Sequence, residues 1–315
     1  MTKKRTEYDN PWKEIIEDFF PSFLEFFFPG VYSIIDWTKP YEFLDSELQK
    51  LEPDAEIGKR LVDKVAKVYL LNGEEAWILV HIEVQSQYDK NFPERMYIYH
   101  YRLFDRHKTK VISLAVLADE QPNWRPSSYG YSLGECRLSL EFPVVKLLDY
   151  ESQWQTLEQT TNPFSIVVMA HLRTKATNQN PESRLQWKLR LVRMLFEKGY
   201  SREEIIGLFR FIDWLMSLPE ELAADFKAEL KREEEAGRMR YVTSIERLAK
   251  QEGKVENARE SVIEVLEARF GKIPSDALES INCINDISVL KSLLRDATTI
   301  SSMEAFVELV NETNL

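Results

Sequence analysis

Two carboxylates, Asp63 and Glu83, lie on opposite sides of an Asn72-Gly73 pair. An Asn-Gly pair between two apolar runs predicts a tight β-hairpin. We expect Leu70 to pair with Ala76 across the turn. Because cross-strand partners then have a constant sum of residue numbers, Asp63 falls directly opposite Glu83, with Cβ atoms roughly 5 Å apart. Two carboxylates at that distance repel unless one is protonated or a divalent cation lies between them, and Mg²⁺ is the natural candidate.

The strand that carries Glu83 is unusually apolar. Residues 76–82 form a nearly continuous apolar run, which is typical of a strand covered on both faces. His81 and Gln85 have the same parity as Glu83 and are expected to point to the same face of the sheet. The alternative is that Asp63 and Glu83 simply end two strands in solvent. The apolar strand argues against that alternative, because a buried carboxylate without a partner is costly.

The two lysines near Asp63 are poorly placed to assist its chemistry. Lys64 is expected on the opposite face of the strand. Lys67 shares the face of Asp63 but lies about 13 Å away along an extended chain. Neither lysine is therefore expected in the carboxylate site.

A helix over residues 93–106 is predicted to follow the hairpin, and it carries a basic stripe. Helical spacing of i, i+4, i+7 and i+11 places four side chains along one face, where they are expected to contact nucleic-acid phosphates: Arg95, Tyr99, Arg102 and Arg106. Lys108 and Lys110 extend the positive charge. The alternative is that the arginines pair with surface acids and that Tyr99 packs in the core. His100 and His171 are interpreted as structural.

Around these residues the pattern indicates an α/β core. A helical aromatic stretch over residues 12–28 is broken at Pro21 and precedes the hairpin strands. Two more strands are expected over residues 111–117 and 137–147. This mixture of elements predicts a mixed α/β core that ends near Tyr150.

The remainder of the chain is predicted to be all-helical. Residues 151–218 are expected to form a helical extension packed on the core, with a capping box at Ser201 and Glu204. Residues 219–270 are rich in Glu, Lys and Arg and predict a charged helical linker or stalk. Residues 271–315 predict a small helical C-terminal domain. A homo-oligomer formed through the C-terminal helices is one expected partner arrangement.

Composition narrows the class of protein. The chain has 315 residues and a formal net charge of −11, which argues against broad, non-specific nucleic-acid coating. Its two cysteines, Cys136 and Cys283, are far apart and predict neither a disulfide framework nor a zinc site. No signal peptide is expected, and the most apolar stretch, residues 19–28, is shorter than the roughly 20 residues that span a bilayer. The expected location is the cytoplasm.

The hairpin and the helix after it carry a family resemblance. Asp63, followed by a turn and Ile82-Glu83-Val84-Gln85, resembles the Asp and Glu-x-Lys or Glu-x-Gln signature of PD-(D/E)XK nucleases. Residues 80–85, together with Phe92, Arg95, Met96, Tyr99 and Arg102, are similar to the bacterial recombination-promoting nuclease and putative transposase (Rpn) family. The likeness covers roughly residues 7–150. The segment Arg269-Phe270-Gly271 and its helices resemble a small C-terminal domain often attached to such proteins.

The resemblance implies a restriction-endonuclease-like αβββαβ core and a set of site residues. Asp63 and Glu83 would hold Mg²⁺, or another divalent cation such as Mn²⁺, with the backbone carbonyl of Val84 as a further ligand. Gln85 stands where many members of the superfamily have lysine, and an amide can orient a water but supplies no positive charge. Glu47 is preferred over Glu14 as the further acid on the first helix.

Together with the carboxylate pair, the resemblance implies a metal-dependent DNA endonuclease that hydrolyses phosphodiester bonds, in recombination or in mobile elements. DNA is the expected partner, and Asp63, Glu83 and Gln85 are the expected catalytic residues. The alternative is a catalytically weak or inactive nuclease-like fold that binds nucleic acid or protein. A third possibility is an oligomeric scaffold built on the charged helices.

Overall fold

The structure is a computed structural model that describes residues 11–44, 62–83, 90–240, 242–271 and 273–313. It is a mixed α/β structure with a helical C-terminal region, as the sequence predicts. Its described residues divide into two compact units, one within residues 11–229 and the other within residues 230–313.

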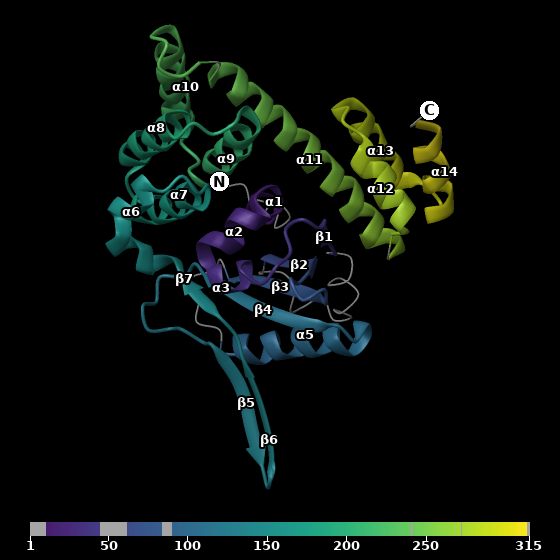
Figure 1. The fold of residues 1–315 in the computed structure, drawn as a ribbon. Coiled ribbons are helices and arrows are strands. Elements are labelled where there is room, and N and C mark those ends of the chain that lie inside the picture. The colour runs from purple at the N-terminus through teal and green to yellow at the C-terminus, as the bar shows by residue number, and fades with distance from the viewer. Residues whose placement is uncertain (1–10, 45–61, 84–89, 241, 272, 314–315) are drawn as a thin grey trace. The chain divides into compact units, whose positions relative to one another are not determined.

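A five-stranded sheet forms the centre of the first unit (Figure 1). Its strand order is β1-β2-β3-β4-β7. The pairings of β1 with β2 and of β2 with β3 are antiparallel, whereas β3, β4 and β7 run parallel. The strands are β1 Glu42–Phe43, β2 Val62–Tyr69, β3 Glu75–Glu83, β4 Lys110–Leu117 and β7 Val144–Lys146.

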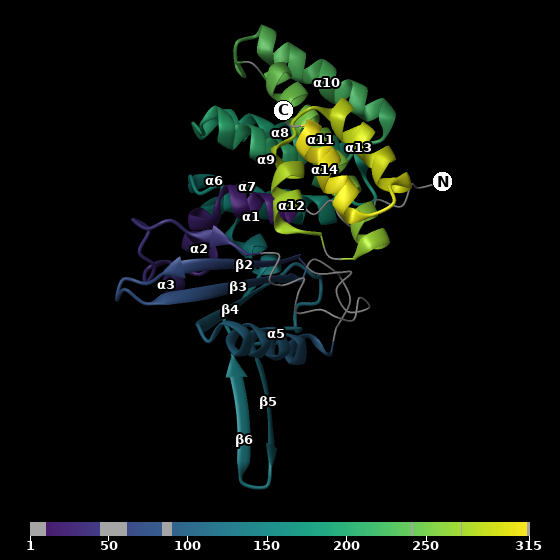
Figure 2. The same ribbon diagram turned by 90° about the vertical axis from the view of Figure 1, so that its right-hand side faces the viewer.

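Helices cover both faces of this sheet, as the apolar run in β3 requires. Helix α5, Phe92–His107, lies on one face, while α1, Pro11–Asp18, and α2, Phe20–Phe27, lie on the other (Figures 1 and 2). The short helix α3, Pro29–Tyr32, follows α2. Ala66 and Ile78 in the middle of the sheet are fully buried. Covered faces explain why β3 and β4 read as apolar runs rather than as alternating patterns.

A two-stranded ribbon extends from the sheet beside α5 (Figures 1 and 2). It consists of β5, Ser128–Leu133, and β6, Cys136–Glu141, joined by a tight turn in which Gly134 has a φ of 58°. The single strand predicted over residues 137–147 is therefore wrong. Its first part is β6 in the ribbon and its last part is β7 in the main sheet. Pro143, which has no N–H to donate, lies between them.

The helical extension is part of the same compact unit as the sheet. It contains η1 Leu147–Gln153, α6 Trp154–Gln159, α7 Phe164–Ala176, α8 Pro181–Glu197, α9 Arg202–Leu215 and the start of α10, Glu220–Glu235. Trp12 of α1 contacts Phe211 of α9 edge to face, with ring centroids 5.5 Å apart. The predicted capping box at Ser201 and Glu204 is confirmed. Residue 150 thus lies between the sheet and the helical extension of one compact unit, and not between two domains.

Among its described residues, the second unit contains the helices α11 Val242–Phe270, α12 Ser275–Cys283, α13 Ile287–Thr299 and α14 Met303–Thr313. Val262 and Leu266 of α11 are fully buried in a shared core with Leu290 and Phe306. The prediction that residues 219–270 form a separate charged linker is therefore wrong for α11, whose apolar face is part of that core. Within the described part of the chain, every helix is too short or too polar to cross a bilayer.

Candidate functional site

The backbone register of the hairpin differs from the predicted one by two residues. Asp63 pairs with His81, and Tyr69 pairs with Glu75, so Asp63 is not directly opposite Glu83. The turn is tighter than expected, because Leu70 N donates to Glu74 O at 2.8 Å and Gly73 N donates to Leu70 O at 2.8 Å. The prediction of a directly facing pair is wrong. In the observed register Asp63 and Glu83 occupy diagonal positions on neighbouring strands.

A shift of two residues keeps Asp63 and Glu83 on the same face of the sheet, because strand positions alternate with a period of two. That face can be identified from the next described residues along β2 and β3. Val65 and Trp77 are buried against Leu103 of α5. Position 63 is two residues from Val65, and positions 81 and 83 are four and six residues from Trp77, so all three belong to the face that α5 covers. Diagonal neighbours in an antiparallel ladder lie roughly 7 Å apart.

Glu83 also pairs in parallel with Leu117, the last residue of β4. The candidate site therefore lies at the carboxyl ends of the adjacent strands β3 and β4. The side chains of Asp63 and Glu83, and the whole of Glu47, Val84 and Gln85, lie outside the described residues. Among the side chains that are described, no three His, Cys, Asp or Glu residues converge as a metal site would require.

The two lysines closest to Asp63 in sequence have partners elsewhere. Lys64 is 3% exposed and contacts Glu17 of α1, on the face of the sheet opposite α5. Lys67 forms an ion pair with Glu75 at 3.0 Å, and this partner raises the pKa of Lys67. The expectation that neither lysine joins the carboxylate site agrees with both contacts.

The predicted stripe on α5 is divided by the packing of the helix. Tyr99 is 3% exposed and packs with Val65, Trp77 and Leu103, so its predicted role as a surface phosphate contact is wrong. Aromatic burial against the sheet determines how α5 is rotated. Arg95 and Arg102 are half-buried, and Arg106 is exposed near the end of the helix.

The positive charge expected beyond the stripe is largely neutralised. Lys108 pairs with Asp105 at 2.8 Å and Lys110 pairs with Glu74 at 2.6 Å. The ring of His107 lies against Trp77, with centroids 4.1 Å apart. The two lysines therefore add little net positive charge at this end of α5.

Glu14, the alternative acid on the first helix, has a structural role. Its carboxylate pairs with Arg210 of α9 at 2.9 Å, on the face of the sheet opposite α5. Glu14 therefore does not belong to the face that carries Asp63 and Glu83. The role of Glu47 as a further acid of the site stays a prediction.

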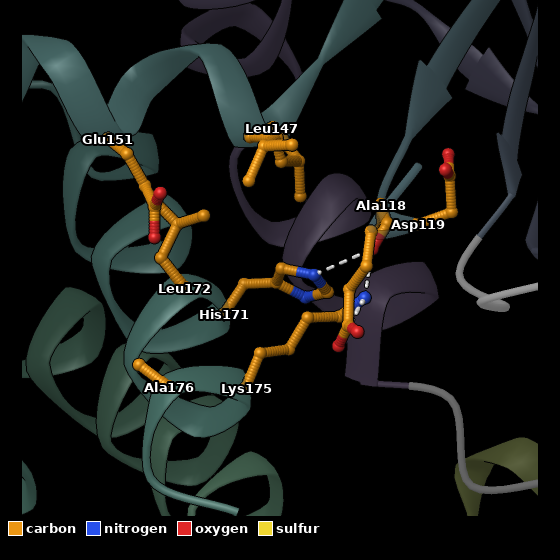
Figure 3. A pocket seen from close by; sticks show the side chains of 10 residues that line it. Ala118, Asp119, Leu147, Glu151, His171, Leu172, Lys175 and Ala176 are labelled. Atoms are coloured by element: carbon orange, nitrogen blue, oxygen red, sulfur yellow. Dashed lines mark hydrogen bonds and ion pairs between the residues drawn. The ribbon is translucent and has the colours of Figure 1, made fainter. Parts of the chain in front are cut away.

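A pocket of about 240 Å³ lies just beyond the end of β4 (Figure 3). Ala118, Leu147, His171 and Lys175 contribute to its lining. His171 Nε2 donates to Ala118 O at 3.1 Å, and Lys175 Nζ donates to the same oxygen at 2.6 Å. Burial lowers the pKa of His171 to about 4, so its imidazole is neutral at pH 7. The interpretation of His171 as structural agrees with this position.

Next to this pocket lies a buried ion pair. Lys146 Nζ contacts both carboxylate oxygens of Asp119 at 2.7 Å and the carbonyl of Trp124 at 3.2 Å. The two side chains are 0% and 1% exposed. Asp119 also accepts from Gln121 N at 2.8 Å. These contacts hold the loop after β4 against β7.

Sequence reasoning did not identify the pocket or the buried ion pair. The residues come from segments that are distant in the chain, namely the end of β4, η1 and α7. The one available signal is that Asp119 comes two residues after the end of the buried strand β4.

Comparisons with protein-family models, with curated proteins and with solved structures give no match to this chain.

Proposed function

We propose that the protein is a metal-dependent endonuclease that hydrolyses phosphodiester bonds in DNA. The observation that carries the proposal is the backbone register, in which Asp63 and Glu83 occupy neighbouring strands on one face of the sheet. An acidic residue on each of two adjacent strands is a recurrent way to hold a divalent cation, since their mutual repulsion is relieved by the ion.

The donor set fits a hard cation. Two carboxylates, from Asp63 and Glu83, and the backbone carbonyl of Val84 are oxygen ligands of the kind that Mg²⁺ and Mn²⁺ prefer. When bound, such a cation polarises a phosphoryl oxygen and lowers the pKa of a coordinated water. Gln85 would orient the attacking water by a hydrogen bond.

The order of elements also supports the proposal. Helices α1 to α3 precede β1, β2 and β3, and α5 and β4 follow, which is the αβββαβ order that the resemblance implies. Arg95 and Arg102 are half-buried side chains of α5, three or four residues from Tyr99, which packs on the sheet. Their guanidinium groups are suited to hold the phosphates on either side of the scissile bond. The net charge of −11 restricts nucleic-acid contact to such local basic groups.

Nicking of supercoiled plasmid DNA tests the proposal. The rate would be measured with Mg²⁺ or Mn²⁺ for the wild type, Asp63→Asn and Glu83→Gln. We expect each substitution to lower the rate roughly 100-fold or more, because the cation supplies several kcal/mol of transition-state stabilisation.

Glu74→Gln is the matched control. Glu74 is an exposed acid at the other end of the same hairpin, where it pairs with Lys110. Its substitution is expected to leave nicking unchanged. Equal nicking by wild type, Asp63→Asn and Glu83→Gln would exclude these carboxylates as the cutting centre.

A second candidate function is a nuclease-like fold that binds nucleic acid without cutting it. It is favoured by Gln85 in place of lysine and by the engagement of Lys64 and Lys67 with Glu17 and Glu75. Calorimetry with Mn²⁺ and binding of a labelled DNA duplex separate the two. DNA binding without measurable metal binding or nicking would select this second function.

A further inference from the structure

The ribbon formed by β5 and β6 is amphipathic. Cross-strand pairing places Tyr129 opposite Leu140, Tyr131 opposite Leu138 and Leu133 opposite Cys136. These six side chains share one face, because directly opposite residues of an antiparallel pair point the same way. The other face is polar and consists of Ser128, Gly130, Ser132, Arg137, Ser139 and Glu141. The ribbon thus has the pattern of a sheet with one side to cover.

Only the base of the apolar face is covered. Tyr129 stacks on Tyr97 of α5, with ring centroids 5.2 Å apart and an angle of 21° between planes. Leu140 packs against the cluster of Phe92 and Phe142. Toward the turn, Tyr131 is 51% exposed and Leu133 is 79% exposed. A two-stranded ribbon with such a tip is marginally stable in water by itself.

Both edges of the ribbon are unpaired among the described residues, since β5 and β6 pair only with each other. At its base, Phe142 N donates to Ser127 O at 2.9 Å, so residue 142 directs its backbone groups inward. Inward and outward positions alternate along an antiparallel strand. Arg137, Ser139 and Glu141 therefore direct their N–H and C=O groups to the free edge of β6.

We propose that β6 pairs antiparallel with β6 of a second copy of this chain, about a two-fold axis at Ser139. In that register Arg137 lies opposite Glu141 of the second copy, twice in each dimer. Leu138 lies opposite Leu140 of the second copy on the other face. The outward backbone groups of residues 137, 139 and 141 then meet outward groups of the same three residues. The opposite charges of Arg137 and Glu141 and the outward direction of the backbone groups at residues 137, 139 and 141 therefore favour the same register, centred on Ser139.

The pairing would extend the apolar face of the ribbon across both copies. The two ribbons form a four-stranded sheet in which both apolar faces lie on the same side. Because the strands are antiparallel, Cys136 at the tip of one ribbon lies opposite Phe142 at the base of the other. Leu133 and Tyr131 lie one strand farther from the second copy, across β6 of their own ribbon. An isologous contact of this kind closes with two copies.

Charge favours a second copy over nucleic acid at this surface. The ribbon carries Arg137 against Glu135 and Glu141, which does not suit a phosphate backbone. The β5 edge is a less specific alternative, because residues 128–133 include no charged side chain that would fix a register. The β6 edge contains a charge of each sign, placed symmetrically about Ser139.

Sedimentation equilibrium of the full chain tests the pairing. The wild type is expected at twice the 37.1 kDa of one chain. Arg137→Glu and Glu141→Arg should each weaken the dimer by about tenfold or more, since each creates two like-charge pairs. The double substitution restores opposite charges and should restore the dimer. A wild type that remains at 37.1 kDa, or a double variant as weak as the single ones, would overturn the proposal.

A pair of proline variants identifies the edge. Ser139→Pro removes an outward N–H of β6, and Ser132→Pro does the same on β5, where it is the matched control. Both serines are exposed on the polar face of the ribbon. We expect Ser139→Pro to be monomeric and Ser132→Pro to remain a dimer, with unchanged circular dichroism in both. A Ser139→Pro dimer as tight as the wild type would show that the copies associate elsewhere.

Discussion

The two sheets of the first unit differ in how their side chains are covered. In the five-stranded sheet, Ala66, Ile78 and Leu114 are fully buried between helices. In the ribbon, Tyr131 and Leu133 are more than half exposed. Because the main sheet is buried on both faces, the stability of each of its strands is coupled to that of the whole unit. The stability of the ribbon depends mainly on its turn and on the hydrogen bonds between β5 and β6. Changes in the main sheet should therefore be global, and changes in the ribbon local.

The largest expected effect is the loss of the buried ion pair at the edge of the main sheet. Lys146→Ala leaves Asp119 buried without its cation, which typically costs about 3–5 kcal/mol of unfolding free energy. Urea denaturation measures this value. The exposed pair of Arg125 and Asp149, about half exposed on each side, is the matched control. Arg125→Ala should cost less than about 1 kcal/mol, and equal losses for the two variants would contradict the distinction.

The next effect is a pH dependence from His171, which packs against the end of β4. Burial lowers its pKa from 6.5 to about 4, so between these values the unfolded chain binds more protons than the folded one. Stability therefore falls as the pH falls through this range, by about 2 kcal/mol between pH 7 and pH 5. Urea denaturation of the wild type and His171→Gln checks this. The variant should lose less stability over the same interval, and an identical pH dependence would rule out His171 as its source.

The smallest effect on global stability is expected in the ribbon. A Cβ at Gly130 would lie 2.6 Å from the carbonyl oxygen of Leu138, so Gly130→Ala must push the two strands apart. We expect faster amide hydrogen exchange at residues 129–140, with a change in unfolding free energy below about 1 kcal/mol. Gly134→Asn is the control, because asparagine tolerates the left-handed conformation of this turn. It should leave amide hydrogen exchange in the ribbon slow. A loss as large as that of Lys146→Ala would show that the ribbon is not an independent part.

Sequence reasoning predicted the elements of the main sheet well, because their apolar runs are long and clearly bounded. The strands β2, β3 and β4 and the helix α5 lie where they are predicted. The register of the hairpin was not predictable, because it depends on how many residues the turn takes up. Leu70 N bonds to Glu74 O rather than pairing with Ala76, and this shorter turn moves Asp63 by two positions.

The arrangement of the candidate site residues was predictable only in part. Helical spacing showed that Arg95, Tyr99 and Arg102 share one side of α5, but not that this side faces the sheet. Charged residues along residues 219–270 concealed the apolar positions Val262 and Leu266, which pack in the C-terminal core. The composition of a helix reflects its solvent-facing residues as well as its buried ones, so a high content of charged residues does not exclude a buried apolar face.

The carbonyl of Ala118 has a practical consequence for anyone who wishes to shorten the gene. Its oxygen accepts from both His171 and Lys175, which lie far beyond residue 150. A fragment that stopped at residue 150 would lose both donors and would uncover Trp12, which packs on Phe211. The smallest piece expected to express as a folded protein therefore extends to about residue 229, where the compact unit ends.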